Sequence, residues 1–299
     1  MGKTKELYDW ITLQNIGLQS PIVQVFGRPL ARPWVVITDF REAQDILLRR
    51  TKEFDRSNFL GDVFLGLLPE HHISMKTDPT FKQHRRWLQD LMTPAFLHQI
   101  AGPQIYTAFL DLLALWEEKS RLAQDRPFEA SVDVFRTALD AAWAAVFGDD
   151  PSNSTTRAQL QLCSSTKSLQ LSGSLDDEAK FPDAPNPAAK QAIITLTESL
   201  ETSIKSPFPV IAHWLLRKTS SMRKAKAIKD DFIREEVEKT KNRFTGRQEN
   251  EREVKCAMDD ILRREMLSSE KENRAPMFHS RAMYDEVFCR ALSNMLAAY

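Results

Sequence analysis

Glycine is scarce in this chain, and that scarcity limits the folds it can adopt. Only 9 of the 299 residues are glycine, whereas tight β-turns depend on glycine to reach positive φ angles. An all-β protein with many tight turns is therefore disfavoured. Apolar residues instead recur at helical spacing, as at Ile105, Phe109, Leu112 and Trp116. The sequence predicts a mainly α-helical protein.

A small sheet is expected near the N-terminus. Residues 21–26 and 34–37 are rich in β-branched and aromatic residues, and Gly27-Arg28-Pro29 separates them with a turn. Asp39 follows as a predicted N-cap, with Glu42 three residues later. The two strands and the helix after Asp39 therefore form one predicted unit.

Helices are predicted over most of the remaining chain. Asp78-Pro79 has the form of a helix start, an acidic N-cap followed by proline at the first helical position. Further helices are expected around the apolar stripe of Phe135, Leu139, Trp143 and Val146 and over residues 188–205, 223–243 and 251–267. Loops are expected over residues 53–77, 149–155 and 171–187.

Charge and cysteine content exclude several classes of function. The 41 basic and 41 acidic side chains cancel, so no nucleic-acid partner is expected. Three widely spaced cysteines favour a reducing compartment over a disulfide framework. No metal site is predicted, because the adjacent His71 and His72 have no evident third and fourth ligand in the sequence. Neither a signal peptide nor an N-terminal membrane anchor is recognised, which predicts a cytoplasmic or peripheral membrane protein.

Four segments, taken in order, resemble a known family. Residues 35–47 form a strand followed by a helix, 53–57 read Glu-Phe-Asp-Arg-Ser, and 84–96 run from His-Arg-Arg-Trp to Pro-Ala-Phe. Ser206-Pro207-Phe208-Pro209 precedes a long charged helix. This series resembles the first half of a cytochrome P450 of the fungal type. The resemblance implies an incomplete fold of that family, mainly α with a small N-terminal β-sheet.

The resemblance implies haem-thiolate monooxygenase chemistry, the O2-dependent oxidation of a small organic substrate. After Val287 the sequence leaves the family pattern, which predicts a P450 portion over residues 1–287 and a divergent tail over 288–299. The I-helix motif, the Glu-x-x-Arg helix and the Phe-x-x-Gly-x-Arg-x-Cys haem loop are absent, and Cys289 lacks the required glycine and arginine. A truncated, inactive form is therefore expected. The alternative is a non-catalytic helical binding or regulatory protein derived from the family.

The family's C helix suggests three cofactor-binding residues. Members of the family hold the haem propionates there with an aromatic residue or histidine and an arginine four residues later. In this sequence His84 is followed by Leu88, and Arg85 by Gln89, so neither register gives the full pair. His84, Arg85 and Arg86 remain the candidates for propionate contacts. No catalytic residue is assigned, and haem is not expected to be held tightly by this chain.

The partners implied by the resemblance are a small apolar substrate and a reductase. Phe208 and Trp214 would contact a membrane surface peripherally, as on the endoplasmic reticulum, or would pack internally; both interpretations stay open. The basic residues between Arg217 and Lys229 precede a run of acids. They are interpreted as the solvated face of a helix, with anionic lipid and RNA as the alternatives.

Overall fold

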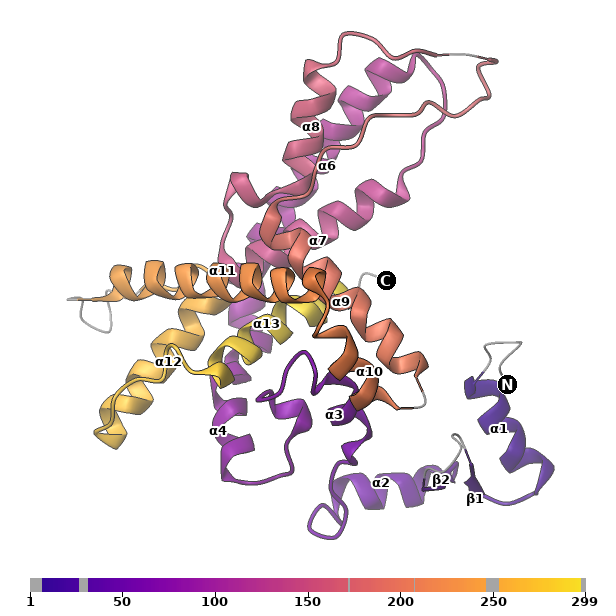
Figure 1. Cartoon of the computed structure of the whole chain (residues 1–299), viewed down its shortest axis with the longest axis vertical. Coiled ribbons are helices and arrows are strands. Elements are labelled where there is room, and N and C mark those ends of the chain that lie inside the picture. The colour runs from indigo at the N-terminus through magenta and orange to yellow at the C-terminus, as the bar shows by residue number, and fades with distance from the viewer. Residues whose placement is uncertain (1–6, 27–31, 172, 207, 246–252, 297–299) are drawn as a thin grey trace.

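The computed structural model describes residues 7–26, 32–171, 173–206, 208–245 and 253–296. Helices dominate these residues, and the single described sheet has two strands (Figure 1). The prediction of a mainly α protein with a small N-terminal sheet is therefore confirmed.

The N-terminal unit forms as predicted. Strands β1 (Ile22–Val25) and β2 (Trp34–Ile37) pair antiparallel, after helix α1 (Leu7–Gly17). Helix α2 (Phe40–Leu48) begins at the predicted N-cap, where the Asp39 carboxylate accepts hydrogen bonds from the N–H groups of the second and third helical residues. The predicted turn at residues 27–29 lies outside the described residues. Local sequence signals are thus sufficient to specify this unit.

The helices that follow stack into an elongated body (Figure 1). In chain order the elements are α3 (Asn58–Phe64), η1 (His72–Ser74), α4 (Pro79–Leu88), η2 (Gln89–Met92), α5 (Pro94–Phe96), η3 (Leu97–Ala101), α6 (Gly102–Ala123), α7 (Ser131–Phe147), η4 (Pro151–Asn153), α8 (Thr155–Ser165), α9 (Ala188–Lys205), α10 (Pro209–Leu216), α11 (Ser220–Phe244), α12 (Ala257–Glu272) and α13 (Arg281–Leu296).

Two sequence-based boundaries need correction. The loop expected over residues 53–77 contains α3 and η1. Helix α3 is seven residues long and its N-cap makes no side-chain hydrogen bond, so it carries no strong local start signal. The helix expected over 251–267 is described only from Ala257, and it continues to Glu272. Helix α13 runs through residue 287, and the boundary placed there from the family pattern stays a prediction.

The main hydrophobic core lies where α7, α9, α11, α12 and α13 meet. Its fully buried members include Ile193, Ile233, Ile261 and Val287. A second, smaller cluster between α6 and α8 consists of Leu115, Leu122 and Cys163. Figure 1 shows α6, α7 and α8 extending away from the rest of the body. The long helices α11 and α13 therefore form the frame from which the site described below is built.

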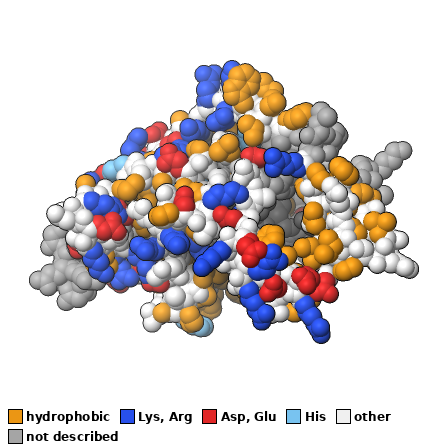
Figure 2. Space-filling view, turned by 90° about the horizontal axis from the view of Figure 1, so that it is seen from below, with side chains coloured by type: hydrophobic (Ala, Val, Ile, Leu, Met, Phe, Trp, Pro, Cys, Tyr) orange, Lys and Arg blue, Asp and Glu red, His pale blue; other side chains and the backbone are white. Residues whose placement is uncertain are grey.

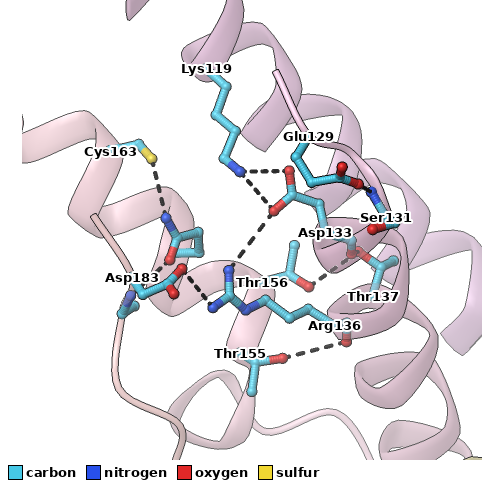
Figure 3. Close-up of polar contacts among 12 residues, drawn as sticks. Lys119, Glu129, Ser131, Asp133, Arg136, Thr137, Thr155, Thr156, Cys163 and Asp183 are labelled. Atoms are coloured by element: carbon cyan, nitrogen blue, oxygen red, sulfur yellow. Dashed lines mark hydrogen bonds and ion pairs between the residues drawn. The ribbon is translucent and has the colours of Figure 1, made fainter. Parts of the chain in front are cut away.

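A buried carboxylate joins the extended helices. Asp133 of α7 is fully buried and accepts hydrogen bonds from Lys119 Nζ at 2.8 and 2.7 Å (Figure 3). It also accepts one from Trp116 Nε1 at 3.2 Å. Arg136 reaches from the same helix to Asp183 in the loop after α8 (Figure 3). Because a buried charge is tolerated only when it is paired, this network fixes α6 against α7.

Large apolar side chains remain exposed on several elements. Ile105 and Phe109 of the predicted α6 stripe are 54% and 50% exposed, whereas Leu112 is buried. Figure 2 shows hydrophobic side chains gathered toward the end of the molecule where Figure 1 draws α1 and the sheet. Among the described residues, no helix combines the length and apolar character needed to cross a bilayer.

Candidate functional site

A cavity of about 1380 Å³ lies between α2, α4 and the segment that follows α2. It is lined by Ile46, Leu47, Thr51, Lys52, Phe54, Asp55, Arg56, His71, His72, Ile73, Thr77, Phe81, Lys82, Arg85, Leu88, Gln89, Met92 and Cys289. The cavity exceeds the usual range of small-ligand sites, about 300–1,000 Å³. It can therefore accept a large planar or branched group.

The cavity wall is cationic. Four of its lining side chains are basic, Lys52, Arg56, Lys82 and Arg85, and its single acid is Asp55. The Asp55 carboxylate is already occupied, because it accepts hydrogen bonds from the backbone N–H and the hydroxyl of Thr77, both at 2.9 Å. A cavity with one sign of charge attracts ligands of the opposite sign. This wall therefore suits an anionic group such as a carboxylate.

Two guanidinium groups share one aromatic ring on this wall. The Arg56 guanidinium lies 3.7 Å from the ring centroid of Phe81, and that of Arg85 lies 5.9 Å from it. Arg56 also donates a hydrogen bond to the backbone carbonyl of His72 at 3.1 Å. Arg56 is therefore anchored, whereas Arg85 is exposed at the cavity.

The three sequence-predicted residues point in three directions. Arg85 alone among them lines the large cavity. His84 is 4% exposed and stacks on Trp87 with ring centroids 4.8 Å apart. Arg86 lines a separate cavity of about 390 Å³ on the far side of α4, beside Arg264. Consecutive residues on a helix are separated by about 100°, so one helix face presents only one of the three.

A buried carboxylate that was not predicted organises the inner wall. Glu286 of α13 is fully buried, and His71, His72 and His84 surround it. The shortest contacts are 3.0 Å from His71 Nε2 to Oε2, 2.7 Å from His72 Nδ1 to Oε2 and 2.9 Å from His84 Nδ1 to Oε1. The backbone N–H of His72 also donates to Oε1 at 2.9 Å. We call these four residues the Glu286 cluster.

Electrostatics keeps this carboxylate charged. Burial by itself would raise the pKa of Glu286, but hydrogen bonds from the three histidines hold the pKa well below its usual range. Its neighbour Asp285 is different: burial raises the pKa of Asp285 to about 6, although the backbone N–H of Glu70 donates to it at 2.9 Å. Two adjacent carboxylates of α13 thus fix the segment from Glu70 to His72.

The Glu286 cluster also has atoms that could ligate a metal. One ligand atom each from His71, His72 and Glu286 lies within 4.8 Å of the others. However, the backbone N–H of Ile73 donates to His71 Nδ1 at 3.1 Å, which leaves the proton of a neutral ring on Nε2. A metal would require a lone pair on that nitrogen. The geometry therefore suits a carboxylate held by imidazole N–H groups better than it suits an ion.

Helix α4 is held in place from its other side by Glu265 of α12. This fully buried carboxylate accepts hydrogen bonds from Trp87 Nε1 at 3.0 Å, from both terminal nitrogens of Arg274 and from the backbone N–H of Met277. Trp87 in turn stacks on His84. The orientation of α4, and with it the direction of Arg85, thus depends on Glu265 and Glu286.

Sequence reasoning missed Glu265 and Glu286. The contacts that join them to α4 span long separations in sequence, 178 positions from Trp87 to Glu265 and 202 positions from His84 to Glu286. The pair His71-His72 was the only local signal of the Glu286 cluster, and it lacked visible partners.

The chain is 33% identical over 289 residues to a cytochrome P450 monooxygenase of Pestalotiopsis microspora, covering 96% of this chain and 50% of that protein. Its identity to the cytochrome P450 monooxygenase TRI13 of Fusarium sporotrichioides is 31%, over 94% of this chain and 49% of the relative. The chain is a cytochrome P450 sequence of the fungal type. A third relative, xilC of Penicillium crustosum, is 32% identical with the same coverage.

The chain spans about half the length of the curated relatives that it matches. No family model matches it. The cytochrome P450 resemblance inferred from residues 35–47, 53–57 and 84–96 is therefore confirmed.

Proposed function

We propose that this chain provides the N-terminal half of a haem-thiolate monooxygenase that oxidises a small apolar substrate with O2 and electrons from a reductase. The observation that carries this proposal is the similarity to fungal cytochrome P450 monooxygenases over 94–96% of the chain. A role in fungal secondary metabolism belongs to the same proposal.

The cationic wall of the cavity supports this proposal, because it suits the edge of haem that carries the propionates. Haem, when bound, would supply the oxygen chemistry. Arg85 would hold a propionate, because its guanidinium donates two parallel hydrogen bonds to a carboxylate. Arg56 and Lys82 would add positive charge along the same wall. His84 is committed to Glu286, and Arg86 faces another cavity, so neither is the better candidate.

The sequence lacks the cysteine loop with which the family binds the haem iron. None of the three cysteines has glycine four residues and arginine two residues before it, as the haem loop of the family requires. A thiolate ligand depends on such surroundings. We therefore propose that this 299-residue chain alone does not bind haem tightly and does not oxidise substrate.

Haem reconstitution tests this proposal. The purified chain is mixed with haem and reduced, and its spectrum is recorded under CO. The expected result is no band of the thiolate type at the Soret position characteristic of the family. A stable thiolate-type band in stoichiometric amount would contradict the proposal.

A chimera tests the role of Arg85. This chain is joined to the second half of the Pestalotiopsis microspora relative, and haem retention is compared among variants. Arg85→Ala should weaken retention by about 1.5–3 kcal/mol, the contribution of a hydrogen bond to a charged group. Arg86→Ala is the matched control, because Arg86 is the adjacent arginine on the other face of α4. Equal retention by the parent and Arg85→Ala would refute the assignment.

A non-catalytic binding protein is the second candidate function. It is favoured by the cationic cavity wall, which is complete within the described residues. A soluble, colourless monomer that binds an anionic ligand at Arg85 would support this candidate over the first.

We also propose a peripheral membrane contact through α10, as on the endoplasmic reticulum. Phe208 and Trp214 are 53% and 50% exposed, with Ile211 and Leu215 beside them at 56% each. Exposed apolar residues on one helix face suit the interface between lipid headgroups and acyl chains. Sedimentation with phosphatidylcholine vesicles tests this. The pair Phe208→Ser and Trp214→Ser should reduce binding, whereas Leu175→Ser, at a similarly exposed loop position, should not.

A further inference from the structure

The corner between α10 and α11 carries an unusual excess of positive charge. Residues 217–229 include six Lys or Arg residues and no Asp or Glu, in a chain whose net charge is zero. Among the described residues, the side chains of Arg217, Arg223 and Lys226 make no hydrogen bond or ion pair, and all three are exposed. Further along α11 the cations are paired with acids, as in Arg234 with Asp231 and Lys239 with Glu236.

These unpaired cations surround a pocket. A cavity of about 160 Å³ opens between the end of α3, α9 and the first turns of α11. Its charged lining consists of Arg217, Arg223, Lys226 and Lys229, with no acid, and its remaining lining is Gly66, Leu67, Leu196 and Met222. Lys229 is fully buried at the base and lies 2.8 Å from Asp230. The volume is of the order that a small tetrahedral anion needs, and a whole cofactor could not fit.

The pocket also lies at a helix start. The Thr219 hydroxyl caps α11 by accepting from the backbone N–H of Met222, a lining residue. The N-terminus of this 25-residue helix adds a partial positive charge to that of the side chains. Two sources of positive potential therefore converge, the exposed cations and the helix dipole, whereas the buried Lys229 is paired with Asp230.

The apolar face of α10 lies beside this pocket. His213 of α10 is 1% exposed and packs so closely on Gly66 that a Cβ at that glycine would lie 2.2 Å from the histidine ring. This contact turns the opposite face of α10 outward, where Ile211, Trp214 and Leu215 are about half exposed. Lys218 Nζ lies 3.6 Å from the centroid of the Trp214 ring, an arrangement suited to the headgroup region.

We infer that the pocket lined by Arg217, Arg223, Lys226 and Lys229 binds the phosphate of an anionic membrane phospholipid while α10 rests on the acyl region. The proposal deepens the membrane contact proposed above and rests on it. Charge complementarity selects the occupant, because the phosphate would meet the exposed cations Arg217, Arg223 and Lys226 and the adjacent apolar face would be covered by lipid. A phosphate in free solution would leave that face exposed.

The experiment measures binding of the 299-residue chain to vesicles of pure phosphatidylcholine and to vesicles that include phosphatidylserine. We expect tighter binding to the anionic vesicles, by about fivefold for each cation engaged, since one such charge contributes about 1 kcal/mol. Arg223→Glu and Lys226→Glu should each remove most of this gain. The matched control is Lys224→Glu, which makes the same charge change at an exposed position of α11 outside the pocket.

The outcomes separate the two proposals. Binding that ignores the anionic lipid, or that Lys224→Glu weakens as much as Arg223→Glu does, would overturn the phosphate site and leave the α10 contact intact. Absence of binding to either vesicle would refute the α10 contact itself. A final arm adds inorganic phosphate without vesicles. Saturable stabilisation that Arg223→Glu abolishes would place the ligand in solution and overturn the membrane assignment.

Discussion

Glu265→Ala should be among the most damaging single substitutions in this chain. The carboxylate is fully buried, and it accepts hydrogen bonds from Trp87, Arg274 and Met277. Its removal leaves the indole N–H of Trp87, which is 2% exposed, without an acceptor, at a cost of about 1–3 kcal/mol. Loss of one partner from a buried charged network costs about 3–5 kcal/mol in total, a large share of a typical stability of about 5–15 kcal/mol.

Urea unfolding measures this loss, with the midpoint and slope compared between variants. Glu272→Ala is the matched control, because Glu272 lies on the same helix and pairs with the same Arg274 at 2.7 Å, but is 49% exposed. An exposed pair is screened by water and contributes little to stability. If the two variants lose stability equally, Glu265 does not anchor α4 and the account of the site fails.

Three further predictions concern single groups. Asp39→Ala should lower the free energy of unfolding by about 1 kcal/mol, because it removes the N-cap of α2; an unchanged urea midpoint would contradict this. Burial raises the pKa of Cys256 to about 12 and also raises the pKa of Cys163. Iodoacetamide at neutral pH should therefore modify the half-buried Cys289 first. Mass spectrometry of peptides measures the order of modification. A hydrogen bond from the backbone N–H of Thr77 lowers the pKa of Asp55 to about 2. This carboxylate therefore stabilises the folded state fully at pH values above its unfolded pKa of about 3.9. The stabilisation is lost as the pH falls through the folded pKa. Asp55→Asn should lose that part of the pH dependence, and identical acid unfolding profiles for the two proteins would refute it.

Local signals predicted the parts of this fold that depend on neighbours in sequence. Asp39 and the Asp78-Pro79 pair each begin a helix where expected, because a cap acts on backbone groups two or three residues away. The hairpin followed from two short strands separated by a turn. Helix α3 was missed because it is short and its N-cap makes no side-chain hydrogen bond.

The candidate site was less predictable, for a physical reason. Arg85 could be proposed from the family's C helix, but the rotation of α4 decides which of His84, Arg85 and Arg86 faces the cavity. That rotation is set by Glu265 and Glu286, through hydrogen bonds that no local pattern encodes. The basic residues of α11 were interpreted as a solvated face, since acids follow them in sequence. The structure pairs Asp231 with Arg234 and Glu236 with Lys239. Arg217, Arg223 and Lys226 are left around a pocket.

The hydrogen bonds from the segment 70–72 to Asp285 and Glu286 have a consequence for the order of folding. The partners are 215 and 214 positions apart, and chains are synthesised at about 5–20 residues per second. Some 10–40 s therefore separate the emergence of the two sides from the ribosome. During that interval His71, His72 and His84 have no carboxylate to surround, and the inner wall of the cavity cannot form. Helix α4 must wait for α13, so the cavity is among the last parts of this chain to acquire its shape, and the nascent chain is exposed to chaperones and proteases for that time.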